Sequence, residues 1–212
     1  MSQTAPAGSC IPPDIRLRSC DDVAMDPIHR PGAIPEPLNL GDGLVILRPW
    51  SLHDLPCIEE ASTDPAIPRG TTVPVPFSEA EGRAFIERQW GRATSGEGVS
   101  LAAAETGRES ATGLICLMHR QQPGVVGLGY WTVASCRRRG LTCRGLILLS
   151  RWALGLSSVD RLEALVEPGN LGSVQVLEGS GFQHEGTLRE YFDFDGTRSD
   201  ALLYSLIPAD LG

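Results

Sequence analysis

The sequence predicts an α/β (α+β) fold in which a mixed sheet carries helices on both faces. Two observations support this prediction. The order of elements is a strand, two helices, three antiparallel strands, a helix, a strand, a helix and two closing strands, which is not the regular alternation of a doubly wound sheet. In addition, the strand-like segment Gly129–Val133 leads through a short basic turn into the apolar segment Leu141–Leu156, as expected for a strand that feeds a buried helix.

Each element has a local signal. Alternating or β-rich runs predict seven strands at 44–50, 100–104, 113–118, 125–133, 161–167, 182–192 and 198–207. Helical spacing predicts four helices, from Leu52 to about Ser62, after Ser78, from Leu141, and from Asn170 to about Gly179. Ser51 and Ser78 are suited to cap the first two helices. Asp195-Gly196 is a hairpin turn signal between the last two strands.

The chain of 212 residues suits one domain plus an extension. Residues 1–42 are rich in Pro and Gly and predict a partly irregular leader. The favoured interpretation is that this leader is a variable segment. A docking or dimerisation role is the alternative. Residues 43–212 are expected to form the functional domain.

Composition narrows the class of protein. The formal net charge of −8 argues against a nucleic-acid-binding protein. Six scattered cysteines show no metal-ligand spacing, which favours a reduced, cytoplasmic setting and no metal site. The N-terminus has no signal-peptide pattern, and no apolar run is long enough to span a membrane.

The basic turn between strand and helix suits an anion. Arg137, Arg138 and Arg139 supply charge, Gly140 permits close approach of the backbone, and the start of a helix presents unpaired N–H groups. A phosphate or pyrophosphate is the expected ligand. A solvated turn and a nucleic-acid patch are the alternatives. The Walker A loop and the G-x-G-x-x-G fingerprint are both absent.

The segment Arg137-Arg138-Arg139-Gly140-Leu141-Thr142 resembles motif A of the GNAT N-acetyltransferases, Arg/Gln-x-x-Gly-x-Gly/Ala, with Thr142 in place of the final small residue. A second stretch resembles motif B of the same family: Asn170-x-x-Ser173, then Gly181-Phe182 and Glu185-Gly186. The order of elements over about Leu44 to Pro208 is similar to the branch of the ribosomal-protein N-terminal acetyltransferases. The resemblance implies a GNAT-type central mixed, mostly antiparallel seven-stranded sheet.

The resemblance also implies roles for residues. Acetyl-CoA would be the cosubstrate, with its pyrophosphate on Arg137, Arg138, Arg139, Gly140, Leu141 and Thr142. Its pantetheine arm would lie against Trp131, Thr132 and Val133, at the end of a strand that splays from its neighbour, and against Asn170. Ser173 would lie near the sulfur and protonate the leaving thiolate. Asn170 is also a normal helix N-cap, so its residue type alone does not decide its role.

The implied reaction also needs a base that takes a proton from the attacking amine. We take Glu167 as the candidate, with Glu185, Asp193, His119, Tyr130 and a bound water as alternatives. Phe77, Phe85 and Trp90 lie on the elements that cover the acceptor side in the family, and they are candidates either for an amine pocket or for ordinary core packing.

The implied function is transfer of an acetyl group to a primary amine, on a protein N-terminus or a small molecule, by direct attack in a ternary complex. A non-catalytic CoA-binding sensor and a transferase for a bulkier acyl group are the alternatives. Nucleic-acid binding through Arg137–Arg139 would predict strongly salt-dependent retention on DNA or RNA. A homodimer is compatible with the sequence, which does not decide the oligomeric state.

Overall fold

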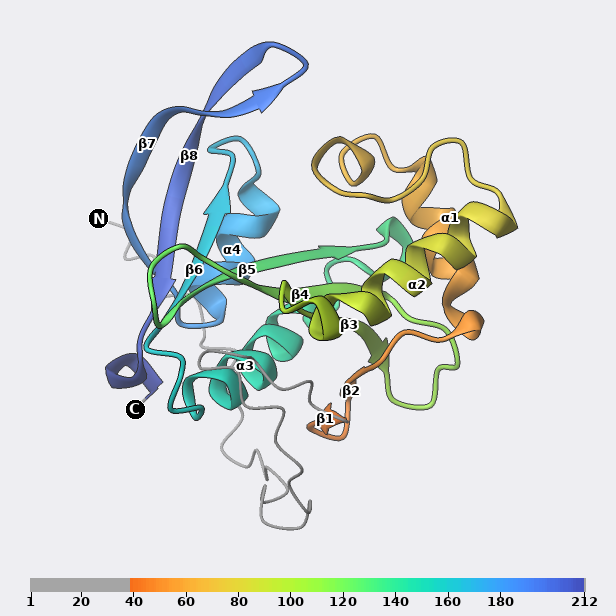
Figure 1. Ribbon diagram of the computed structural model, residues 1–212, viewed down its shortest axis with the longest axis horizontal. Coiled ribbons are helices and arrows are strands. Elements are labelled where there is room, and N and C mark those ends of the chain that lie inside the picture. The colour runs from red at the N-terminus through yellow and green to blue at the C-terminus, as the bar shows by residue number, and fades with distance from the viewer. Residues whose placement is uncertain (1–38, 212) are drawn as a thin grey trace, which may run out of the picture.

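The computed structural model describes residues 39–211, which form one eight-stranded sheet flanked by helices (Figure 1). The strands lie in the order β1-β2-β3-β4-β5-β6-β8-β7, and every neighbouring pair is antiparallel except β5 and β6. Their bounds are β1 Leu40–Gly41, β2 Val45–Arg48, β3 Gly98–Glu105, β4 Gly113–His119, β5 Val125–Thr132, β6 Arg161–Val166, β7 Gln183–Phe194 and β8 Thr197–Leu206.

The helices divide between the two faces of the sheet. Helices α1 (Leu55–Thr63) and α2 (Glu79–Ser95) cover one face, and α3 (Leu141–Leu154) and α4 (Leu171–Gly179) cover the other (Figure 1). Short 3-10 turns are η2 Leu52–Asp54, η3 Pro68–Gly70, η4 Ala134–Cys136 and η5 Pro208–Leu211. The predicted mixed sheet with helices on both faces is therefore confirmed.

Two apolar cores lie on opposite sides of the sheet. Along β3, Leu101 and Ala103 pack in the core under α3, whereas Ala102 between them packs in the core under α1 and α2. Ile115 and Leu117 on β4 repeat the first orientation. This alternation is the period-two pattern of a strand whose two faces are both buried.

The structure adds one strand to the seven that the sequence predicts. β1 is only two residues long and pairs antiparallel with β2. It lies at the end of the predicted leader 1–42, so residues 40–41 of that segment form a strand of the sheet. The remainder of that leader, with Cys10 and Cys20, lies outside the described residues.

The first helix departs from its predicted start. Ser51 donates its N–H to Asp54 Oδ2 at 2.8 Å, as the capping signal predicts, but the turn that follows is the 3-10 turn η2 rather than α-helix. The α-helix itself begins at Leu55. Ser78 caps α2 as expected, since its Oγ accepts the N–H of Glu81 at 3.2 Å.

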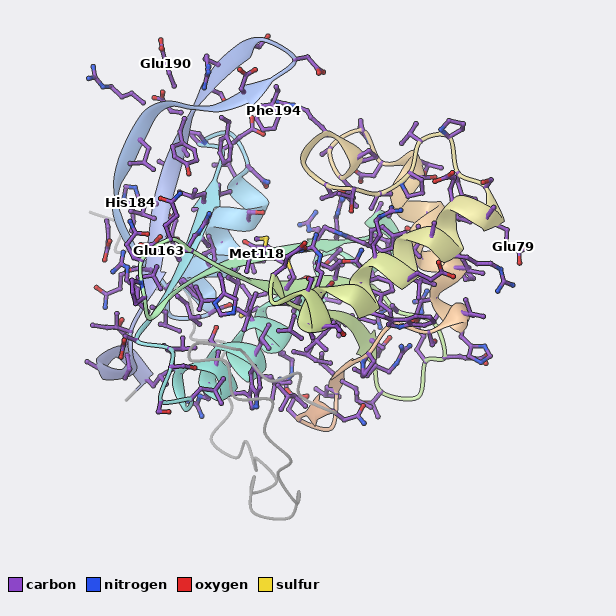
Figure 2. The ribbon with its side chains drawn as sticks, viewed as in Figure 1. Glu79, Met118, Glu163, His184, Glu190 and Phe194 are labelled. Atoms are coloured by element: carbon purple, nitrogen blue, oxygen red, sulfur yellow. The ribbon has the colours of Figure 1, made fainter. Side chains whose placement is uncertain are left out.

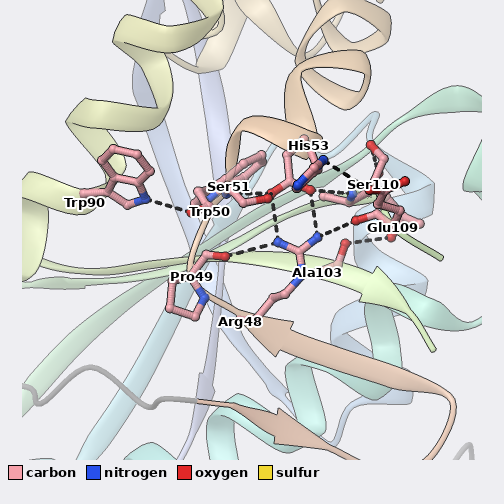
Figure 3. A network of polar contacts seen from close by, with 12 residues as sticks. Arg48, Pro49, Trp50, Ser51, His53, Trp90, Ala103, Glu109 and Ser110 are labelled. Carbon is pink, nitrogen blue, oxygen red and sulfur yellow. Dashed lines mark hydrogen bonds and ion pairs between the residues drawn. The ribbon is translucent and has the colours of Figure 1, made fainter. Parts of the chain in front are cut away.

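A buried polar network fixes the start of this helical layer against the sheet (Figure 3). Asp54 is fully buried and accepts two hydrogen bonds from Arg48 at 2.8 Å each. It also accepts the N–H of Ala111, in the β3–β4 connection, at 2.7 Å. Trp90 of α2 donates its Nε1–H to the carbonyl of Trp50 at 2.7 Å. Helices α1 and α2 are thus anchored to the sheet at both ends of the β2–α1 connection.

The last two strands form a long hairpin that projects from the sheet (Figures 1 and 2). Asp195 and Gly196 form its turn with φ of 53° and 81°, as the sequence signal predicts. Within residues 39–211, none of the helices is both long and apolar enough to cross a membrane.

Candidate active site

The central feature of the site is a separation of two parallel strands. β5 and β6 pair only from Val125↔Arg161 to Gly127↔Glu163 within the described residues. Beyond that point both strands continue, to Thr132 and to Val166, without a ladder between them. We call this opening the splay. Figure 1 shows β5 and β6 diverging. The splay predicted from the resemblance is therefore present in the fold.

The register of β5 decides which backbone groups face the splay. Val133 donates its N–H to Thr112 O, on the β4 side, at 3.0 Å. Because hydrogen-bonded pairs alternate along an antiparallel ladder, Trp131 also faces β4, whereas Tyr130 and Thr132 face the splay. Of the three residues expected to contact the pantetheine arm, Trp131, Thr132 and Val133, Thr132 is the one whose backbone N–H faces the splay. The backbone N–H of Tyr130 faces the splay as well.

The side chain of Trp131 packs in the core beneath α1 and α2. It is buried at 7% exposure and packs near Trp50 and Phe85, with ring centroids 6.1 and 6.5 Å away. Phe85 is itself buried in this core and meets Trp50 edge to face. Phe85 therefore belongs to the core rather than to a surface pocket. Of the other two aromatic candidates, Trp90 is exposed and Phe77 packs at the margin of the same core.

The basic turn leads from the end of β5 into the first turn of α3. Arg138 and Gly140 both have left-handed backbones, with φ of 61° and 75°. Gly140 is the N-cap of α3 and has no side chain with which to cap it, so the cap residue itself leaves the first N–H groups of the helix uncovered. Such turns gather N–H groups into an anion-binding concavity, and the helix dipole adds to the effect.

The three arginines of the turn have different surroundings. Arg137 donates to Asp64 Oδ2 at 2.6 Å and to the carbonyl of Thr132 at 3.0 Å. Arg139 pairs with Glu105 at 2.5 Å. Arg138 is exposed and makes no side-chain hydrogen bond or ion pair within residues 39–211. Arg138 is therefore the arginine whose charge is available to an incoming anion.

Thr142 departs from the small residue of the family motif, and the fold gives it a partner. Its Oγ1 lies 2.6 Å from Oγ1 of Thr132. This contact ties the first turn of α3 to the last residue of β5. Leu141 beside it is buried in the core, so only its backbone is available to a ligand.

The start of α4 lies on the other side of the splay. Asn170 caps the helix, because its Oδ1 accepts the N–H of Ser173 at 3.1 Å. Tyr130 reaches across the opening and donates its hydroxyl to the carbonyl of Ser173 at 3.0 Å. Burial raises the pKa of Tyr130 to about 12, so the phenol is protonated at neutral pH and acts as a donor.

Four of the candidate bases lie at three different places in the fold. Glu167 follows β6 at the open end of the splay and accepts a hydrogen bond from Arg69 at 3.1 Å. Glu185 bonds to Arg161, and His119 pairs with Val126, so both lie at the closed end where β5 and β6 still pair. Asp193 is occupied at the hairpin turn, where it accepts the N–H of Gly196 at 2.8 Å.

The structure also places residues at the site that the sequence gives no reason to choose. Arg69, in the loop between α1 and α2, lies with its guanidinium carbon 4.0 Å from the ring centroid of Phe194 and also contacts Glu167. Figure 2 shows Phe194 near the far end of the hairpin. Asp64 holds Arg137. The only local signal at Asp64 is the following proline, which indicates the end of a helix.

Comparisons with known proteins agree with this geometry. A family model described as an acetyltransferase (GNAT) domain matches residues 45–183. The probable N-acetyltransferase YjcK of Bacillus subtilis is 30% identical over 83 residues, which is 39% of this chain and 46% of that protein. The aligned part thus spans about half the length of this curated relative.

Solved structures resemble the whole domain. The Mycobacterium smegmatis RimJ, solved with CoA-disulfide, is similar with a TM-score of 0.68 and 22% identity over 82% of this chain and 87% of that one. A putative ribosomal-protein-serine acetyltransferase from Vibrio cholerae has a TM-score of 0.68 and 19% identity, covering 80% and 97% of the two chains. At these identities the likeness concerns the fold. Because the family model covers most of the domain, the chain belongs to the GNAT acetyltransferase family.

Proposed function

We propose that this protein transfers the acetyl group of acetyl-CoA to a primary amine by direct attack in a ternary complex. The observation that carries the proposal is the position of the splay, which opens between the basic turn at the start of α3 and the start of α4. A thioester bound there would have phosphate-binding groups at one end and donors near its carbonyl.

Acetyl-CoA would use both ends of this opening. Its pyrophosphate is assigned to the N–H groups around Gly140 and to the unpaired Arg138, because both favour an anion. The pantetheine arm would lie along β5. There the N–H groups of Tyr130 and Thr132 face the splay, and one of them would stabilise the oxyanion that forms at the thioester carbon.

The acceptor would enter from the side of α1 and α2. The amine attacks the thioester carbon and loses a proton to Glu167, directly or through water. The C–S bond then breaks, the departing sulfur takes the hydroxyl proton of Ser173, and Ser173 regains a proton from water, to which Glu167 releases its own. Tyr130 bonds to the carbonyl of Ser173 and so helps to fix this part of α4 beside the reaction. Glu167 would have to exchange its contact with Arg69 for one with the amine.

Two observations favour a class of acceptor. The Vibrio cholerae neighbour is named a putative ribosomal-protein-serine acetyltransferase, which favours a protein as the acceptor, and we propose its N-terminal α-amino group. The net charge of −8 favours a basic acceptor. Small-molecule amines are the second class to be screened. The reduced, cytoplasmic setting expected from the cysteines is compatible with either class.

The proposal is tested by measuring CoA thiol release and product mass with acetyl-CoA, N-terminal peptides and small amines. We expect turnover with at least one class of acceptor and a loss of about 100-fold in kcat for Ser173→Ala, since general acid catalysis has this magnitude. Ser157→Ala, at an exposed position beyond the opposite end of α3, is the matched control and should keep wild-type activity.

Two results would contradict the proposal. Binding of acetyl-CoA without turnover on any acceptor would favour the sensor alternative. Turnover with succinyl-CoA well above that with acetyl-CoA would favour the bulkier acyl group.

A further inference from the structure

Asp64 directly follows α1 and uses both of its carboxylate oxygens. Oδ1 accepts the backbone N–H groups of Ala66 and Ile67 at 2.8 and 3.1 Å. Oδ2 accepts the guanidinium of Arg137 at 2.6 Å. The carboxylate is only 6% exposed. One buried group therefore bonds to two segments that approach the splay from different parts of the chain.

The Oδ1 bonds shape the loop on the acceptor side. They turn the chain after α1 into η3, which carries Arg69. Arg69 then reaches Glu167 and the ring of Phe194. The loop 64–70 is thus linked, through Asp64 at one end and Arg69 at the other, to the open end of the splay.

The hydrogen bond between Asp64 Oδ2 and Arg137 holds the segment that leads from β5 into the basic turn. Arg137 is held between Asp64 and the carbonyl of Thr132, so its Nε–H and one Nη2–H are used within the protein and fix the orientation of the guanidinium. A second carboxylate of α1 supports the same segment, since Glu60 accepts the N–H and the hydroxyl of Ser135 at 2.8 Å each. The C-terminal part of α1 therefore fixes the chain that leads into the basic turn.

Asp64 is ionised at neutral pH. Burial by itself raises the pKa of Asp64, but the N–H groups of Ala66 and Ile67 and the guanidinium of Arg137 together outweigh burial and hold that pKa below its ordinary value of 3.8. The contact with Arg137 is consequently a charge-assisted hydrogen bond, which is the strong kind.

We propose that Asp64 is a positioning residue that aligns the cofactor-side turn and the acceptor-side loop together, and that Arg137 acts through this contact rather than by binding phosphate. The inference deepens the proposed function and rests on it for the identity of CoA as the ligand. It predicts that the two sides of the site become ordered together, because they share one buried carboxylate.

The direction in which Asp64→Asn changes the affinity for CoA separates this inference from a purely electrostatic effect. Asp64 is a negative charge close to a site for an anion, so Coulomb's law alone predicts that Asp64→Asn strengthens CoA binding and frees Arg137 for phosphate. A positioning role predicts the opposite, because Arg137 is then no longer held between Asp64 and the carbonyl of Thr132 at the end of β5.

The first experiment is calorimetric titration of CoA into the wild type, Asp64→Asn, Arg137→Gln and the double variant. We expect Kd to rise about tenfold in each single variant and no further in the double variant, because residues that act as one unit are non-additive. The dependence of Kd on salt should be the same in Arg137→Gln as in the wild type, since no phosphate contact is lost. Glu79→Gln, which breaks the exposed pair with Arg83 on α2, is the matched control.

The second experiment is hydrogen exchange on the protein without CoA. Arg137→Gln should raise amide exchange in residues 64–70 as well as in its own turn, whereas Glu79→Gln should raise it in neither. This readout uses no ligand, and the Arg137 variant keeps the test open if Asp64→Asn does not fold.

Three results would overturn the inference. One is CoA binding by Asp64→Asn that equals or exceeds that of the wild type. Another is a shallower salt dependence in Arg137→Gln, which would make Arg137 a phosphate ligand. The last is an exchange effect confined to the turn that contains Arg137. Failure of the wild type to bind CoA would instead contradict the proposed function, and the exchange data would still decide whether Asp64 joins the two segments.

Discussion

Glu185 and Glu167 differ in their neighbours, and this difference decides which of them is suited to act as the base. The guanidinium of Arg161 and the hydroxyl of Ser205 lower the pKa of Glu185 to about 2. Glu185 also lies at the closed end of the splay. A carboxylate with so low a pKa is a weak base at neutral pH. Glu167 lies at the open end and is the candidate that keeps a position suited to proton transfer.

Glu185→Gln should therefore leave the acetyl-transfer rate within about twofold of the wild-type rate, because the residue neither reaches the splay nor accepts protons at working pH. The rate as a function of pH is the measurement, with Glu167→Gln as the comparison, for which we expect a loss of about 100-fold. A loss of tenfold or more in the Glu185 variant, in a protein that is still folded, would contradict this assignment.

Residue types suggested the site, and the fold determined how each residue is used. The charge of the basic turn points to Arg137, Arg138 and Arg139 equally. Their difference comes from partners that are remote in sequence, since Asp64 and Arg137 are 73 positions apart. Likewise, Val133 meets the strand criteria, but the ladder with β4 decides that its N–H points away from the splay. Local pattern contains no information about either partner.

At the scale of elements, α3 is held in place by the short connection between β1 and β2. Asp42 accepts the N–H groups of Leu44 and Val45 at 2.9 Å each and the Nε–H of Arg144 at 2.6 Å. Arg144 lies one turn into α3 and 102 positions away. This contact holds the β1–β2 connection against α3, inside a stretch whose Pro and Gly content predicts irregular structure.

Asp42→Asn should destabilise the protein by about 2 kcal/mol at pH 7, because it removes a carboxylate that is 2% exposed and leaves Arg144 without this charged partner. Burial raises the pKa of Asp42, but the N–H groups of Val45 and Leu44 and the charge of Arg144 outweigh it, so that the folded pKa is lowered. The contribution is therefore complete above the ordinary value of 3.8 and lost as pH falls through the lower folded value.

Denaturant unfolding of both proteins between pH 7 and pH 3 measures this effect. The stability difference between wild type and Asp42→Asn should be constant down to about pH 4 and shrink below it. A difference that is absent at pH 7, or that grows in acid, would show that Asp42 does not anchor α3 in this way.

Helices and strands were predictable to within a few residues because each carries its own periodicity and caps, such as Ser78 before α2 and Asp195-Gly196 in the hairpin. The elements that the sequence missed lack such signals. β1 has two residues and owes its existence to pairing with β2. The 3-10 turn η2 follows a correctly predicted cap, and Pro56 lies at the start of the α-helix that succeeds it.

At the scale of the whole molecule, an acidic chain surrounds a locally basic turn. The net charge is −8, yet Arg137, Arg138 and Arg139 meet at the start of one buried helix. Carboxylates of other elements neutralise Arg137 and Arg139, which leaves Arg138 and the helix N-terminus for an anion. If the pyrophosphate of acetyl-CoA binds at this turn as we propose, the local positive charge attracts it although the overall charge of the protein repels polyanions.

Calorimetric titration of acetyl-CoA into the wild type and into an Arg138→Glu/Gly140→Asp variant is the most direct test of this central claim. We expect micromolar binding by the wild type and its loss in the variant, because both changes place negative charge at the N-terminus of α3 and Gly140 has a left-handed backbone. Equal binding by both proteins, or no binding by a folded wild type, would contradict the assignment of the turn to the pyrophosphate.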